Sequence, residues 1–299
     1  MLRKWMSFFC ACTVIVASSA CYADTYVNAP VVNLFEKGED NADVETQAIY
    51  GTIVQVVAKG QGDWVKVAMP DQDQGWMKSS ELIEKVEYAK KAPICKVSSV
   101  VAPVYRQADT AVGLPLLKLP FETRLEIVDQ PDDSARRWIQ VRLLDGTLGW
   151  IQRGDLQVDP SGVLNMDQMV TLGYQFMGLP YTWGGTSSFG YDCSGYVQML
   201  YRQMGVDLPR NSREQVKSDA LVSVDLQDLK PGDLIFFGAN ESKNTHVAMY
   251  VGEGKVIQTG ARTPRPFLTV WSLQENFWDR LYPYSTARRL AAVAPTPQQ

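Results

Sequence analysis

The chain has 299 residues, 45% of them hydrophobic, and a formal net charge of -4. This length allows two or three domains that each bury a core, and this composition is that of an ordinary globular protein. The slightly acidic balance provides no basic surface for nucleic acid, and no internal apolar run is long enough to span a bilayer.

The N-terminus predicts export. Arg3 and Lys4 precede an uncharged apolar stretch, and small residues follow it up to Ala23. This order is typical of a secretory signal peptide, so we expect cleavage after Ala23 and a mature chain in the periplasm or cell envelope. A lipid anchor at Cys21 is the alternative, although Ser18 stands where a lipoprotein signal carries a large aliphatic residue.

Removal of residues 1–23 would leave two cysteines, Cys95 and Cys193. Because they fall in different predicted domains, we expect two free thiols even in an oxidising compartment. The chain has a single histidine and no Cys/His cluster with metal-ligand spacing. We therefore expect neither a structural zinc site nor a cofactor.

An internal repeat predicts two small β-barrels. Four landmarks recur 74 positions later in the chain: Trp64 as Trp138, Gly75 as Gly149, Trp76 as Trp150 and Leu82 as Leu156. Within each copy apolar residues alternate, as in half-buried strands, with a hairpin turn at Asp71 or at Asp145–Gly146. The pattern resembles bacterial SH3-like modules, which we place at residues 24–86 and 87–160. Two unrelated small β-domains are the alternative interpretation.

Residues 161–289 differ from the two preceding modules, because their sequence predicts helices followed by strands. Asn165 is expected to cap a helix that runs to about Met177. We expect four later strands, at Asp233–Phe237, Val247–Val251, Lys255–Thr259 and near Leu281–Ser285. This order predicts an α+β domain, and residues 290–299 are expected to form a disordered tail.

Cys193 is the candidate nucleophile. Asp192 suits the N-cap of an amphipathic helix that ends near Gly205, which puts Cys193 in the first turn. There the helix dipole and unpaired amides favour a thiolate, so we expect a pKa below the ~8.5 of a free cysteine. An inert buried cysteine is the alternative, and it is the fate expected for Cys95.

His246 is the candidate base because a thiol enzyme needs an imidazole to accept and return a proton, and the chain has no other. A tight turn at Gly252–Gly254 between two strands would bring Gln258 beside His246. Its amide oxygen would then accept the Nδ1 proton and fix the tautomer.

These residues belong to a series of short motifs that together resemble the NlpC-type cysteine peptidases, in that family's order. The motifs are Pro180–Gly185, Asp192–Gly195, Leu208–Arg210, Leu229–Leu234 and His246–Gly252. The resemblance implies a multidomain chain: two small all-β SH3-like barrels followed by an α+β papain-like catalytic domain over residues 161–289. Two preceding SH3-like modules resemble the branch that hydrolyses γ-D-glutamyl–diamino acid (diaminopimelate) bonds. The resemblance thus implies peptidoglycan or murein stem peptides as the substrate, and no cofactor.

The resemblance also implies roles for four residues. Cys193 matches the nucleophile and His246 the general base. Gln258 occupies the third polar position, where many relatives carry histidine. Tyr181 matches a tyrosine near the nucleophile that would donate a hydrogen bond to the oxyanion.

Three further residues are candidates for substrate binding: Asp192, Ser194 and Glu45. Asp192 and Ser194 flank the nucleophile, and Asp192 is equally well interpreted as a helix cap alone. Glu45 resembles an acidic residue of the first SH3-like module that recognises a free N-terminal amine; a solvated surface glutamate is the alternative. Relatives often carry a tyrosine just before the Gly-Trp of this module, whereas this chain has Asp73–Gln74 there.

Two other classes of function remain open from the sequence. One is a cell-wall-binding protein whose last domain is inactive, and the retention of Cys193 and His246 argues against it. The other is a papain-like acyl transferase or lipid acyl hydrolase, which often shows a membrane-facing apolar segment that the predicted mature chain lacks.

Overall fold

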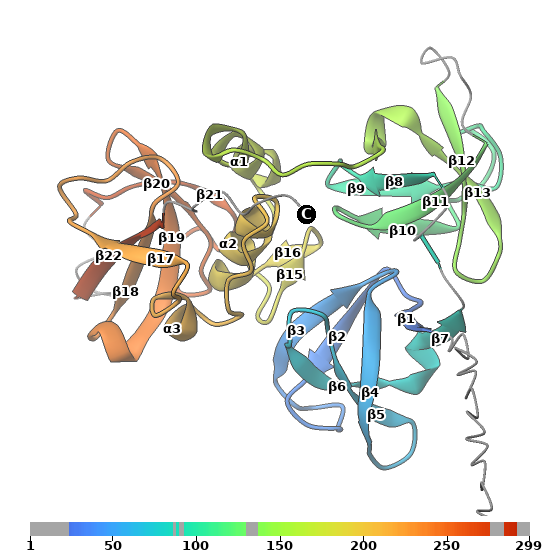
Figure 1. The fold of residues 1–299 in the computed structure, drawn as a ribbon, viewed down its shortest axis with the longest axis horizontal. Helices are drawn as coiled ribbons and strands as arrows, with labels where there is room; N and C mark the ends of the chain where they lie inside the picture. Colours follow the sequence, from blue (N-terminus) through green and yellow to red (C-terminus); the bar gives the residue numbers. More distant parts are fainter. Residues whose placement is uncertain (1–23, 86–87, 90–92, 130–136, 276–283, 292–299) are drawn as a thin grey trace, which may run out of the picture.

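The computed structural model describes residues 24–85, 88–89, 93–129, 137–275 and 284–291. The predicted signal peptide and residues 292–299 of the predicted tail lie outside the described residues. Figure 1 shows two β-barrels, drawn in blue and green, beside a yellow-to-red unit of helices and strands. Within the described ranges, no helix has the length and apolarity to span a membrane.

The first barrel is one antiparallel sheet with the strand order β3-β2-β6-β5-β4-β1-β7. Its strands are β1 (Asp24–Val27), β2 (Val31–Phe35), β3 (Val44–Ile49), β4 (Ile53–Lys59), β5 (Trp64–Ala68), β6 (Gln74–Lys78) and β7 (Leu82–Lys85). Alternate residues such as Leu34, Val67 and Met77 point inward and are fully buried. The alternation in the sequence therefore predicted the core face of these strands.

The second barrel combines a sheet of order β13-β12-β11-β8-β14 with a separate pair of strands, β10-β9. Its strands are β8 (Ile94–Val97), β9 (Val101–Val104), β10 (Leu117–Pro120), β11 (Arg124–Asp129), β12 (Trp138–Arg142), β13 (Leu148–Gln152) and β14 (Leu156–Val158). The predicted repeat is confirmed in register, because Val141 pairs with Gly149 as Val67 pairs with Gly75.

The third unit is an α+β domain, as predicted. Its helices are α1 (Met166–Gly173), α2 (Cys193–Arg202) and α3 (Ser212–Gln215), and a two-stranded hairpin, β15 (Thr186–Ser187) and β16 (Gly190–Tyr191), precedes α2. Its main sheet has the order β17-β22-β18-β19-β20-β21. These strands are β17 (Leu221–Val224), β18 (Leu234–Gly238), β19 (Asn244–Gly252), β20 (Lys255–Gln258), β21 (Thr269–Ser272) and β22 (Tyr284–Leu290).

Three details of this domain differ from the sequence prediction. The first helix, capped by Asn165 as expected, ends at Gly173 and continues as a 3-10 turn to Phe176. The short strands β17 and β21 were not predicted, since four residues provide too little alternation to recognise. The last strand begins at Tyr284, and most of the stretch expected near Leu281–Ser285 falls outside the described residues.

The helix α2 packs on the sheet and carries the functional segment. Val197, Leu200 and Tyr201 are buried against β18 and β19 in the largest hydrophobic core of the chain. The Asp192 side chain accepts a hydrogen bond from the Gly195 amide at 2.7 Å, as predicted for the N-cap. The position of Cys193 in the first turn of the helix therefore follows from both the cap and the apolar stripe.

The first barrel contacts the α+β domain at the β15–β16 hairpin, and the second barrel contacts it at α2 and at the turn of that hairpin. The first barrel docks through Gln47 of β3, whose side chain accepts hydrogen bonds from the Thr186 amide and the Ser187 hydroxyl. The second docks through Glu122, which accepts two hydrogen bonds from the Arg202 guanidinium.

Gly184 allows the first barrel to approach closely. Its φ is +72°, and a Cβ at this position would lie 2.6 Å from the carbonyl oxygen of Val44. A side chain there would collide with β3, so glycine is required at this contact.

Candidate active site

Cys193 stands at the start of α2 with its thiol beside the edge of β19. The backbone amide of Val247, the residue after His246, donates to the thiol, and so does the amide of Ser194. Cys193 keeps partial solvent access, whereas His246 is buried. The structure thus brings the predicted nucleophile and the strand of the predicted base to the same place.

The expected low pKa of Cys193 is wrong for this structure. Burial raises the pKa of the Cys193 thiol to about 12, and the neighbouring Asp192 charge raises it further, while the two amides lower it. Removal from water disfavours the thiolate by more than the helix start stabilises it. The raised pKa keeps the Cys193 thiol neutral at rest.

His246 is neutral as well. Burial lowers the pKa of His246 to about 4, although the nearby Gln258 side chain and the charge of Asp192 oppose this shift. Gln258 is buried on β20, whose residue Ile257 pairs with Met249 of β19. The effect of Gln258 on this pKa shows that the two buried side chains are neighbours, as the sequence predicted, while the hydrogen bond from the imidazole to the amide oxygen stays a prediction.

Asp192 does more than cap the helix. Its Oδ1 accepts from the Gly195 amide, from the Ser194 hydroxyl at 3.1 Å and from Nη1 of Arg210 at 3.0 Å. Nη2 of Arg210 donates to Oδ2 of the same carboxylate. Both residues are buried, so the first turn of α2 rests on a buried bidentate ion pair.

The remaining predicted residues differ in how deeply they are buried. Ser194 is buried and its hydroxyl also accepts from Nη1 of Arg210 at 3.0 Å. Tyr181 is half-buried, and its backbone amide donates to the carbonyl of Pro266, which ties its loop to the segment after β20. Glu45 is exposed on β3, next to the Val44 contact with Gly184.

Comparison with known proteins places this geometry in a family. The sequence pattern of the NlpC/P60 family matches residues 178–285, which contain Cys193, His246 and Gln258. A "Gamma-D-glutamyl-L-lysine dipeptidyl-peptidase" of Bacillus cereus is 34% identical over 262 residues, covering 82% of this chain and 75% of that protein. The chain belongs to the NlpC/P60 family of cysteine peptidases.

Further relatives agree with this membership. A protein of the same name from Bacillus subtilis is 31% identical and covers 72% of each chain. The crystal structure of an NlpC/P60 family protein from Bacillus cereus superimposes with a TM-score of 0.76 and 27% identity, covering 89% of this chain and 99% of that one. The two barrels match as well: residues 34–82 fit the bacterial dipeptidyl-peptidase Sh3 domain and residues 110–157 the GW (Gly-Tryp) dipeptide domain.

Sequence reasoning missed two groups of this NlpC/P60 site. Arg210 lies in a recognised motif, but its ion pair with Asp192 was not predicted. Gln215 of α3 was not considered, and its Nε2 donates to the carbonyls of Ser194 and Pro209. No local pattern marks these contacts, because the ion pair and the bond to Ser194 join segments about 20 positions apart.

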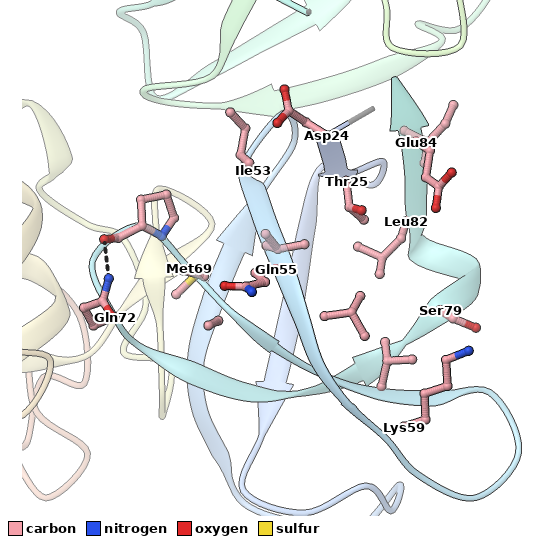
Figure 2. Close-up of a pocket in the computed structure, with 16 residues that line it drawn as sticks. Asp24, Thr25, Ile53, Gln55, Lys59, Met69, Gln72, Ser79, Leu82 and Glu84 are labelled. Carbon is pink, nitrogen blue, oxygen red and sulfur yellow. Dashed lines mark hydrogen bonds between the residues drawn. The ribbon is translucent and has the colours of Figure 1, made fainter. Parts of the chain in front are cut away.

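A separate groove of about 860 Å³ lies on the first barrel, between β1, β4, β5 and β7. Figure 2 shows Thr25, Gln55, Leu82 and Glu84 around it, with Met69 and Gln72 at the end where the β5–β6 turn lies. The residues that line the groove all belong to this barrel, so it is distinct from the site at Cys193.

Proposed function

We propose that the chain is a cysteine endopeptidase that hydrolyses the γ-D-glutamyl–diamino acid bond of peptidoglycan stem peptides. The observation that carries this proposal is the placement of Cys193 at the capped start of α2 beside β19, within a chain that is similar over most of its length to dipeptidyl-peptidases named for γ-D-glutamyl-L-lysine. The substrate is a murein peptide in which the γ-carbonyl of D-glutamate forms the acyl side of the bond that is cut.

In the first half of the reaction, the Cys193 sulfur attacks the γ-carbonyl carbon of D-glutamate while its proton passes to His246. The neutral resting pair supports this order, because proton transfer inside the pair creates the thiolate only as the new C–S bond forms. Tyr181 and the Cys193 amide would donate hydrogen bonds to the oxyanion.

In the second half, the tetrahedral intermediate collapses and the C–N bond breaks. His246 gives its proton to the departing diamino-acid amine, which leaves a thioester on Cys193. His246 then takes a proton from water, the hydroxide attacks the thioester, and the regenerated thiol recovers its proton. Gln258 would hold the imidazole orientation throughout, which its buried position beside His246 supports.

The binding of the acyl part falls to the residues between α2 and the first barrel. Ser194 and Asp192 would contact the polar groups of D-glutamate, with Asp192 also fixed by Arg210. Glu45, exposed on β3 beside the Gly184 loop, would attract a free N-terminal amine. Export through the signal peptide, with a lipid anchor at Cys21 as the variant form, would place the enzyme where such peptides occur.

The test is mass spectrometry of L-Ala-γ-D-Glu-diaminopimelate after incubation with purified residues 24–299. We expect L-Ala-D-Glu and diaminopimelate with the wild type and neither product with Cys193→Ala or His246→Ala. An intact peptide in every reaction, with folded protein and a reduced thiol, would refute cleavage of free peptides; binding to murein without turnover would then support the wall-binding alternative.

A further inference from the structure

A half-buried carboxylate of the first barrel lies against the nucleophile helix. Asp73 ends the turn between β5 and β6, and its carboxylate lies close to the side chain of Gln198 on α2. Gln198 is itself buried and donates to the carbonyl of Leu208 at 3.0 Å. Oδ2 of Asp73 is buried and has no hydrogen-bond partner among the residues that the structure describes. The side chain is therefore held inside the joint between two domains.

The turn itself does not require an aspartate. In the first barrel the Met69 amide donates to the Asp73 carbonyl at 2.9 Å. In the second barrel the Leu143 amide donates to the Thr147 carbonyl at 2.8 Å, 74 positions later. Because threonine supports the same turn, the carboxylate at position 73 has another reason to be there.

The negative charge of Asp73 is not balanced by a cation of its own. Arg210 is paired with Asp192, and Arg202 with Glu122, so both nearby cations are already neutralised. Asp71, on the same turn, adds a like charge. Burial raises the pKa of Asp73 from 3.8 to about 6, Asp71 raises it further, and Arg210, Gln198 and Arg202 lower it.

Arg210 has one donor left to offer. Its two terminal nitrogens bind Asp192 and Ser194, the residues on either side of Cys193. Its Nε is buried and unpaired among the described residues. An ionised Asp73 attracts this guanidinium through its charge, without a direct hydrogen bond to Nε.

We propose that Asp73 is a positioning residue for the reaction: it acts through Arg210 on the Asp192 cap and so on the placement of Cys193. The first barrel then takes part in catalysis through a charge as well as through its shape. Ionised Asp73 stabilises the arrangement of Arg210, Asp192 and Ser194 that places the Cys193 thiol for attack. Protonation of Asp73 removes this stabilisation. This inference rests on the proposed peptidase activity.

The test compares Asp73→Asn with the wild type in kcat/KM for L-Ala-γ-D-Glu-diaminopimelate between pH 4.5 and 8. We expect the wild type to lose activity as the pH falls through about 6. Asp73→Asn should be about tenfold less active at pH 7.5 and show no loss near pH 6, since an amide mimics the protonated acid. Asp145→Asn in the equivalent turn of the second barrel is the matched control and should keep the wild-type profile.

A stability measurement separates positioning from folding. A carboxyl with a raised pKa in the folded state stabilises the fold at low pH, and this contribution is lost as the pH rises from about 4 through about 6. At pH 7.5 Asp73→Asn should therefore melt no lower than the wild type while being less active. An Asp73→Asn protein that is both less active and less stable would overturn the proposal. So would one that still loses activity as the pH falls through about 6.

Alkylation of Cys193 by iodoacetamide in a Cys95→Ser background gives a readout that needs no peptide. Its rate should change near pH 6 in the wild type and lack that change in Asp73→Asn. Identical pH profiles would refute the inference even if the peptide is not the substrate, whereas an uncleaved peptide with different profiles would refute only the proposed function.

Discussion

Gln258 lies beside His246, and we expect its amide to orient the imidazole toward the thiol through a hydrogen bond. Both side chains are buried, so no solvent replaces this contact when it is removed. An amide orients the ring as a histidine or carboxylate would, but it adds no charge to stabilise imidazolium. The buried, neutral character of His246 at rest is consistent with this choice.

Gln258→Ala should therefore lower kcat about tenfold, the effect of losing one hydrogen bond of about 1.5 kcal/mol, with little change in KM. Gln258→His, the residue that many relatives carry, should retain most of the activity and serves as the control. Steady-state kinetics on the diaminopimelate peptide make the comparison. Full activity of Gln258→Ala would contradict an orienting role.

For single residues, the sequence predicted which side chains lie together better than it predicted their pKa values. The Asp192 cap and the Gln258 contact followed from spacing alone, because a helix start and a hairpin are local. The direction of the Cys193 pKa was predicted wrongly, since it depends on burial by residues that are remote in the sequence. Glu45 was predicted only from the resemblance, and its exposed position on β3 beside the Gly184 contact depends on domain packing.

The helix α2 depends on the ion pair at its start. Arg210 is buried, and the Asp192 carboxylate raises the pKa of Arg210 although burial lowers it. Removing one member of a buried pair leaves the other uncompensated, which costs more than the lost attraction alone.

Asp192→Ala should accordingly lower the free energy of unfolding by about 3–5 kcal/mol, because it removes the helix cap and leaves Arg210 as a buried charge without its counter-ion. Asp192→Asn keeps an acceptor for the Gly195 amide and should cost less. Asp167→Ala, at an exposed position in the first turn of α1, is the control and should change stability by at most about 0.5 kcal/mol. Urea unfolding measures all three, and a cost of under about 1 kcal/mol for Asp192→Ala would contradict this account.

Long elements with clear alternation were predicted, and short ones were not. The repeat revealed the strands β5, β6, β12 and β13 because two copies support one another. The helix α3, with four residues, and the strands β17 and β21 depend on tertiary contacts rather than on a pattern of their own.

At the scale of the whole molecule, the two barrels meet the catalytic domain through polar contacts that join distant segments. Gln47 meets Thr186, Glu122 meets Arg202, and Ser188 donates to the carbonyl of Val100. The barrels also share a core in which the Leu144 amide donates to the Tyr50 hydroxyl at 2.6 Å. The sequence predicted the three units and their order, but it holds no local signal for these contacts.

The assembled molecule makes one central claim, that Cys193 accepts the L-Ala-γ-D-Glu acyl group. The most direct measurement is peptide mass spectrometry after incubation with L-Ala-γ-D-Glu in which the γ-carboxyl is converted to a diazomethyl ketone. The account predicts one covalent adduct on Cys193, unchanged in Cys95→Ser and absent in Cys193→Ser. An adduct on Cys95 in place of Cys193, or no adduct on a folded and reduced protein, would contradict it.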